Sequence, residues 1–245
     1  MGSFCDSDKN SRYGLTSNAF WVLSRMYDDD VTFKDTILEA FKNLDSKYGL
    51  KTFEPHFEPE TKGVGRIPKL PAGTAENGAA YIHASIFGIA ALFRMGCPEL
   101  AWEQMIKSLP FTHGYISCSP YVMPNSYGLN TGKNIDGESM QDWQTGSSNI
   151  LLKVLLKYVV GICPEYDGVW IQPAVYRPFS NLKTEIKIKN CILKLQIEYA
   201  GRKSRKFFVN GIERANQMDR IMNLEKLWID QDELNQKELS IKVIC

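Results

Sequence analysis

The first two thirds of the chain carry the apolar spacing of α-helices. Between residues 33 and 48 the apolar positions are three or four residues apart, so they share one face of a helix: Phe33, Ile37, Phe41, Leu44 and Tyr48. Thr32 offers an N-cap for this helix, and Gly49 offers a stop signal. Residues 79–96 are apolar on every side, which predicts a helix buried on most sides.

Two more helices are expected in this part of the chain. Pro98 opens the first of them, at a position where proline costs no hydrogen bond. The second begins near residues 145–149 and carries an apolar stripe that starts at Ile150. The connecting stretches 50–75 and 110–140 are long for a helical bundle, and long ordered loops usually carry function.

After the stretch 161–168 the apolar period changes from that of a helix to that of a strand. Apolar and polar side chains alternate over residues 193–199, which is typical of a half-buried antiparallel strand. Asn210 and Gly211 stand between two apolar flanks, and this pair predicts a hairpin turn. The alternation returns over residues 239–243.

The two patterns predict two domains and a fold that is mainly α with a C-terminal β domain. Residues 1–163 form the helical domain, and residues 164–245 form an antiparallel β domain. The chain shows no internal repeat and no low-complexity segment.

Composition excludes several classes of function. Apolar residues make up 44% and charged residues 23% of the sequence, as in a globular protein. The net charge of +1 gives no electrostatic reason to expect nucleic acid or an anionic membrane as a partner. The basic run at 202–206 is interpreted as a solvated turn rather than as a binding patch.

Location and metal content follow from the N-terminus and the cysteines. The first ten residues contain no apolar core of a signal peptide, and no apolar run is long enough for a comfortable membrane span. The six cysteines are scattered singly, without the spacing of a metal site. Free thiols in a reducing cytoplasm are therefore expected, with no metal and no membrane association.

Three polar clusters are candidate sites. Glu76 and Asn77 lie in a glycine-flanked loop, and His83 follows where the apolar helix begins; a buried structural histidine is the alternative. The segment 142–149 places hydroxyls and free N–H groups at the start of a helix, which suits an oxyanion or an ordinary N-cap. The loop 119–128, which contains Tyr121, suits a sugar platform or a tight surface loop.

The order of these clusters resembles a known family. The segments "PAGTAENGAAYIH", "PYVMPN", "WQTGSSN" and "GICPEYDGVWIQPAV" are similar, in this order, to the C-terminal part of cellobiose phosphorylases, the inverting glycoside phosphorylases of glycoside hydrolase family 94. The segment "SNAFWVLSRM" (17–26) is similar to the helix that precedes these motifs in the family. The resemblance covers nearly the whole chain.

The resemblance implies a fold and an activity. The implied fold is a partial (α/α)₆ barrel followed by an antiparallel β-sandwich-like domain. The implied activity is that of a hexosyltransferase acting with phosphate: phosphorolysis of a β-glucoside, which releases a sugar 1-phosphate with inversion. The implied substrates are a β-linked oligosaccharide and inorganic phosphate, the latter as co-substrate, without a further cofactor.

The resemblance also implies roles for single residues. His83, Thr145 and Gly146 match phosphate-binding positions, and Glu76, with Asn77 and Tyr121 beside it, matches the substrate-binding side. Glu76 is expected to face the pocket and not to pair with a lysine or arginine.

One expected catalytic group is missing. The family's general acid is the aspartate of a "DWND"-type motif upstream of the matched segments, and this sequence has no such motif. Asp142 precedes a tryptophan but lies inside the phosphate-turn motif, so no catalytic residue is assigned. Ala75 replaces a basic residue that the family often carries, and Arg66 with Lys69 could read an acidic acceptor such as an aldonic acid or simply lie in a solvated loop.

Three functions stay open. The first is a fragment of a glycoside phosphorylase, either a truncated gene product or one piece of a split enzyme, inactive alone and completed by an upstream partner chain or in a homo-oligomer. The second is a non-catalytic carbohydrate-binding or interaction module derived from that family. The third is a hydrolase on the same architecture, which needs a second, base carboxylate that the sequence does not reveal.

Overall fold

The computed structural model describes residues 12–26, 30–113, 119–142, 146–174, 178–201 and 204–245. The chain divides into two compact units, Met1–Leu152 and Lys153–Cys245. The two domains expected from the sequence, 1–163 and 164–245, stay a prediction.

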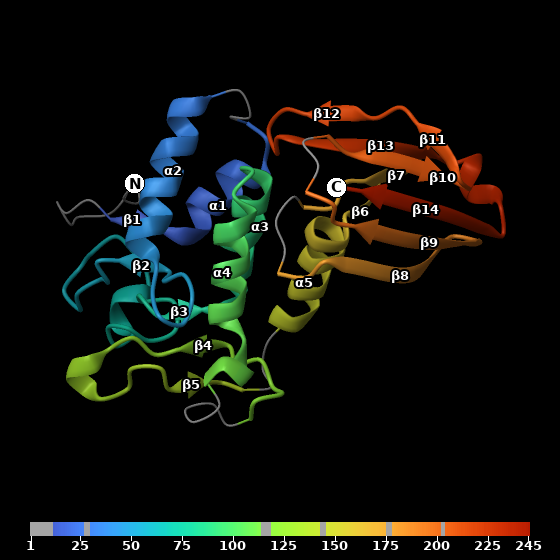
Figure 1. The fold of residues 1–245 in the computed structure, drawn as a ribbon. Helices are drawn as coiled ribbons and strands as arrows, with labels where there is room; N and C mark the ends of the chain where they lie inside the picture. The colour runs from blue at the N-terminus through green and yellow to red at the C-terminus, as the bar shows by residue number, and fades with distance from the viewer. Residues whose placement is uncertain (1–11, 27–29, 114–118, 143–145, 175–177, 202–203) are drawn as a thin grey trace. The chain divides into compact units, whose positions relative to one another are not determined.

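Of the described α-helices, four lie wholly within the first unit: α1 (Leu15–Leu23), α2 (Val31–Leu44), α3 (Ile82–Arg94) and α4 (Pro98–Ser108). Helix α3 packs against both α1 and α4 (Figure 1), which explains why its sequence is apolar on every side. Helix α2 is capped by Asp30, whose Oδ1 accepts a hydrogen bond of 3.0 Å from the backbone N–H of Phe33. The expected N-cap at Thr32 is therefore wrong by two residues.

The loops of the first unit contain short strands and turns. Strand β1 (Tyr13–Gly14) pairs with β2 (Phe53–Glu54), and a second sheet has the order β3-β4-β5. Its strands are Ala80–Tyr81, Ser126–Tyr127 and Ser139–Met140. The 3₁₀ turns are Ile67–Lys69 (η1), Pro110–His113 (η2) and Thr131–Lys133 (η3).

A fifth helix, α5 (Ser147–Val154), continues as a π-helical segment, Leu155–Val160, that ends at Gly161. Gly161 has a φ of 81°, a left-handed conformation that glycine adopts at low cost at a helix end. None of the described helices combines the length and apolar character that crossing a membrane requires.

Two sheets make up the second unit. The four-stranded sheet has the order β12-β13-β7-β6, and the five-stranded sheet has the order β11-β10-β14-β9-β8 (Figure 1). The strands are β6 (Ile162–Pro164), β7 (Gly168–Ile171), β8 (Asn181–Ile188), β9 (Cys191–Glu198), β10 (Lys206–Val209), β11 (Ile212–Arg214), β12 (Gln217–Asp219), β13 (Leu224–Asp230) and β14 (Glu238–Ile244), with a 3₁₀ turn at Glu233–Asn235 (η5). Both sheets contribute buried side chains to one apolar core.

The strand and hairpin predictions in this unit are confirmed. Strand β9 alternates as expected, with Leu193, Leu195 and Ile197 buried. Strands β10 and β11 pair around Asn210-Gly211, and both turn residues have positive φ, 49° and 82°. Such a pair of left-handed residues is the two-residue turn that matches the twist of antiparallel strands.

The expected fold class is wrong. The described residues hold five α-helices and fourteen strands in four sheets, so the chain is not mainly α and its described helices form no (α/α)₆ barrel. One cause lies in the loops 50–75 and 110–140, which contain two-residue strands too short to leave a period in the sequence.

The expectation that all strands of the β domain are antiparallel is also wrong for one pair of strands. Strand β14 runs parallel to β9, with Leu239 opposite Leu193. Alternation of apolar and polar residues defines the two faces of a strand but not the direction of its neighbour, so the sequence pattern could not separate the two cases.

Candidate functional site

The sheet β3-β4-β5 joins three of the sequence motifs. Strand β3 follows the Glu76–Asn77 loop and leads into α3, which carries His83. Strand β4 follows the loop that contains Tyr121, and β5 ends shortly before the segment 142–149. Asn125 connects all three, since its carbonyl accepts from the N–H of Ile82 (2.9 Å) and its N–H donates to the carbonyl of Met140 (3.0 Å). Strands that flank the three motifs, up to 60 residues apart in sequence, thus pair in one sheet.

His83 lies beside the start of α5. A Cβ atom placed on Gly146 would be 4.0 Å from Cε1 of His83. The carbonyl of Gly146 accepts from the N–H of Ile150 (3.3 Å), so the helix begins here and its first N–H groups are directed away from the helix body. Thr145, the third predicted phosphate ligand, lies outside the described residues. The structure therefore brings together the two predicted phosphate positions that it describes.

An aromatic row holds the imidazole in place. His83 stacks on Phe87 with ring centres 5.4 Å apart and an interplanar angle of 23°. Phe87 in turn contacts Phe20 of α1, at 4.8 Å. No hydrogen bond joins the nitrogens of His83 to another residue of the described part of the chain. The sequence analysis did not predict these aromatic contacts. The spacing of four residues between His83 and Phe87 nevertheless indicates a shared helix face.

Glu76 forms an ion pair with Arg66. The carboxylate of Glu76 accepts a hydrogen bond from Nη2 of Arg66, whose side chain is 73% exposed, while that of Glu76 is 33% exposed. The expectation that Glu76 avoids a pairing with a basic residue is therefore wrong. Thr52 holds the adjoining backbone, because its Oγ1 donates to the carbonyl of Glu76 and accepts from the N–H of Gly78, both at 2.9 Å.

Asn77 is buried rather than open to a ligand. Its side chain is inaccessible to solvent, and its amide is engaged by the backbone on both sides. Oδ1 accepts from the N–H of Phe57 (2.8 Å), and Nδ2 donates to the carbonyls of Phe57 (3.0 Å) and Leu70 (2.9 Å). These three bonds use both donors of the amide.

Tyr121 is open to solvent, whereas Asp142 is partly buried. Tyr121 is 92% exposed, at the tip of its loop. Asp142 accepts a hydrogen bond of 3.0 Å from the hydroxyl of Ser139, and its other oxygen is buried without a partner among the described residues.

Thiol and metal chemistry find no support in the described residues. Cys97, Cys163, Cys191 and Cys245 are free thiols there, and burial raises the pKa of Cys163 to about 11, so that thiol is protonated at neutral pH. No group of three metal-ligating side chains comes together within the described part of the chain.

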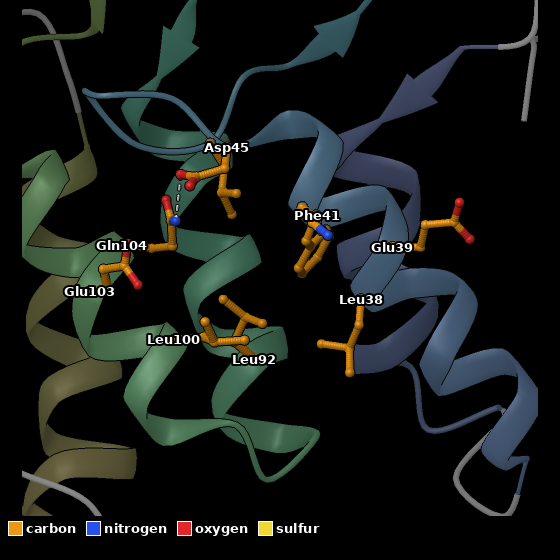
Figure 2. A pocket seen from close by; sticks show the side chains of 10 residues that line it. Leu38, Glu39, Phe41, Asp45, Leu92, Leu100, Glu103 and Gln104 are labelled. Atoms are coloured by element: carbon orange, nitrogen blue, oxygen red, sulfur yellow. Dashed lines mark hydrogen bonds between the residues drawn. The ribbon is translucent and has the colours of Figure 1, made fainter.

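A separate cavity of about 570 Å³ lies between α2 and α4 (Figure 2). Half of its lining residues are apolar (Leu38, Phe41, Leu50, Leu92 and Leu100), and half are polar (Glu39, Lys42, Asp45, Glu103 and Gln104). Figure 2 shows the hydrogen bond of 2.7 Å from Nε2 of Gln104 to Asp45 at its edge. None of the predicted site residues lines this cavity.

Comparison with known proteins gives several relatives, all phosphorylases. The chain is 30% identical over 168 residues to a 3-O-beta-D-glucopyranosyl-beta-D-glucuronide phosphorylase of Paenibacillus borealis, over 66% of this chain and 22% of the relative. It is 30% identical over 143 residues to a solabiose phosphorylase of the same organism, over 56% of this chain and 18% of the relative.

A third relative extends the match to more of this chain. It is a cellobionic acid phosphorylase of Neurospora crassa, 23% identical over 197 residues, which are 78% of this chain and 25% of the relative. The chain thus spans a quarter or less of the length of these three relatives.

A family model settles the family. The model described as "Glycosyl hydrolase 94 superfamily, catalytic domain" matches residues 2–161, the part of the chain that holds His83, Gly146 and Glu76. The resemblance to glycoside phosphorylases is therefore confirmed, and the chain belongs to the glycosyl hydrolase 94 superfamily through its catalytic domain.

Proposed function

We propose that this chain forms one part of a phosphorolysis site for β-glucosides. In the reaction an oxygen of inorganic phosphate forms a bond to the anomeric carbon, the glycosidic C–O bond breaks, and the leaving oxygen takes a proton. The product is a sugar 1-phosphate of inverted configuration. The proximity of His83 to Gly146 carries this proposal, because it places an imidazole beside the residue that precedes α5.

The chemistry needs positioning more than activation. Phosphate is already an anionic nucleophile, so the base that an inverting hydrolase uses to activate water is not required. What raises the rate is an oxygen held in line with the anomeric carbon. An imidazole N–H and a helix N-terminus suit this task, since charge-assisted hydrogen bonds each contribute roughly 1.5–3 kcal/mol.

Loss of the imidazole tests the phosphate site. We expect His83→Ala to lower the affinity of the chain for inorganic phosphate by about tenfold or more, which corresponds to the loss of one such hydrogen bond. Isothermal titration of the purified chain measures the affinity. His56→Gln is the matched control, because His56 pairs with Glu58 in a half-exposed position and does not contact Gly146. Equal affinities in wild type and His83→Ala would remove the phosphate assignment.

The proposed acceptor is a sugar that carries a carboxylate. Arg66 projects largely into solvent beside Glu76, and Lys69 in the same loop is exposed. Two relatives are named for acidic sugars, a glucuronide and cellobionic acid. A guanidinium binds a carboxylate through two parallel hydrogen bonds, which makes it a selective group for such an acceptor.

Substitutions in the Arg66–Glu76 pair are expected to change the preference for glucuronate over glucose in opposite directions. Arg66→Ala is expected to lower the affinity for glucuronate several-fold, with little change for glucose. Glu76→Gln is expected to favour glucuronate over glucose, because it removes the carboxylate that competes for Arg66. Competition titrations with the two sugars measure the ratio, and Lys62→Ala in the same loop is the control. A ratio unchanged in both variants would exclude the pair from acceptor recognition.

A second candidate function is a binding module without chemistry. The two described carboxylates of the site, Glu76 and Asp142, are held by Arg66 and Ser139, and neither is assigned the proton donation that a general acid supplies. We therefore propose that residues 1–245 bind ligands but do not catalyse phosphorolysis alone. An assay of glucose 1-phosphate release, with and without the upstream part of a relative, separates the two candidates.

A further inference from the structure

Residues 58–69 form a loop whose two ends are held by one side chain. Asn77 bonds both main-chain groups of Phe57 at one end and the carbonyl of Leu70 at the other, over 2.8–3.0 Å. A compact loop of this length with its ends held together is an Ω-loop, a type that is frequently functional. Gly63 and Gly65 within it have positive φ values of 81° and 70°.

Only an asparagine satisfies this arrangement. The closure needs one acceptor for the N–H of Phe57 and two donors for the carbonyls of Phe57 and Leu70. The side-chain amide of asparagine supplies this set, while an aspartate offers no donor and would place its charge against two carbonyl oxygens. Because the side chain is fully buried, no water can replace a lost partner without rearrangement.

Asn77 also lies next to Glu76, the residue that pairs with Arg66 of the Ω-loop. Glu76 precedes Asn77 directly, and its backbone carbonyl is held by Thr52. The backbone of the turn is closed as well, because the N–H of Gly73 donates to the carbonyl of Asn77 at 2.8 Å. Arg66 reaches Glu76 from the Ω-loop. Asn77 thus connects the backbone that carries the carboxylate with the loop that carries the guanidinium.

We infer that Asn77 is the positioning residue of the acceptor site. It closes the Ω-loop and so determines where Arg66 meets Glu76, without touching a ligand itself. The inference rests on the proposed function as far as it concerns the acceptor, and it replaces the expected role of Asn77 as a sugar contact. Phosphate binding at His83 and Gly146 does not depend on it.

The experiment uses the purified chain with Asn77→Ala and the isosteric Asn77→Asp, which keeps the shape and one acceptor if the alanine variant fails to fold. Gln104→Ala is the matched control, because Gln104 is also a buried amide of the first unit and donates to Asp45, away from the loop. Three quantities are measured: amide hydrogen exchange over residues 57–78, the affinity ratio of glucuronate to glucose, and the affinity for inorganic phosphate.

Both Asn77 variants are expected to raise exchange over residues 57–78 at least tenfold and to reduce the glucuronate-to-glucose ratio at least fivefold. Phosphate affinity should stay within twofold, and Gln104→Ala should leave the exchange and the ratio unchanged. A merely structural Asn77 would lower stability without moving the ratio, and that result overturns the inference.

Each of the remaining outcomes would overturn a specific part of the inference or of the proposed function. Unchanged exchange in the loop overturns the closure by Asn77. Equal loss of sugar and phosphate affinity overturns a role specific to the acceptor. A wild-type chain that binds phosphate but neither sugar overturns the acceptor role together with the proposed acceptor, whereas a chain that binds both sugars but no phosphate contradicts the phosphorolysis site alone.

Discussion

Residues 1–245 alone are expected to release no detectable glucose 1-phosphate from cellobiose or cellobionic acid in the presence of phosphate. Protonation of the leaving oxygen by a positioned acid contributes on the order of 10²–10⁴-fold, and it needs that acid within hydrogen-bond reach. Of the site carboxylates in the described structure, Glu76 is bound by Arg66 and Asp142 by Ser139. An oxocarbenium-like transition state must also be held from several sides.

A coupled assay for glucose 1-phosphate on the purified chain measures this turnover. The positive control is a full-length relative such as the cellobionic acid phosphorylase of Neurospora crassa. Adding the upstream part of such a relative to this chain should produce activity, and His83→Ala should abolish it. Turnover by residues 1–245 alone that disappears in His83→Ala would mean that the chain contains its own general acid.

The second large effect is expected on stability, from Gly161→Ala. Gly161 ends the π-helical segment with a φ of 81°, where a side chain costs about 1 kcal/mol of backbone strain. An added Cβ would also lie 2.1 Å from the backbone nitrogen of Pro173 and 2.3 Å from its Cα. Backbone atoms cannot rotate away as a side chain can, and the N–H of Gln172 donates to the carbonyl of Gly161 at 2.7 Å. We therefore expect a total loss above about 3 kcal/mol in the second unit.

Gly211→Ala is the matched control for this substitution. Gly211 has nearly the same φ, 82°, but no atom lies within 4 Å of an added Cβ. Only the backbone strain of about 1 kcal/mol remains, which lowers the midpoint of thermal unfolding by roughly 4–8 °C in a unit of this size. Calorimetry should show a decrease more than twice as large for Gly161→Ala. Similar decreases for the two variants would show that the contact with Pro173 is not a close one.

Local patterns explain which parts of this fold the sequence predicted. The helix over residues 33–44, the buried character of α3 and the Asn210-Gly211 hairpin depend on neighbouring residues, so their spacing carries the signal. The expected end of that helix at Gly49 is wrong, because α2 ends at Leu44 and Tyr48 lies beyond it. The parallel pair β9–β14 depends on residues more than 40 positions apart, and nothing in either strand specifies the direction of the other.

In the candidate site, too, some features could be predicted from the sequence and others could not. His83 and Gly146 were predicted as neighbours because their motifs match a family in order, and Gly146 is in fact found beside His83. The pairing of Arg66 with Glu76 and the burial of Asn77 were missed, because both depend on how the loop 58–69 folds back. A polar residue in a loop looks the same in sequence whether it binds a ligand or holds the loop together.

The most direct test of the proposed site is a titration of the chain with inorganic phosphate, followed through its three histidine rings and the amide of Gly146 by NMR. Nε2 of the buried His113 donates to the carbonyl of Lys107 (2.7 Å), and His56 pairs with Glu58, so both rings serve as internal references. We expect the resonances of His83 and Gly146 to shift together and saturate with one dissociation constant while the other two rings stay unchanged. Saturable binding that leaves His83 and Gly146 unmoved, or shifts of all three rings alike, would contradict the assignment of the phosphate site.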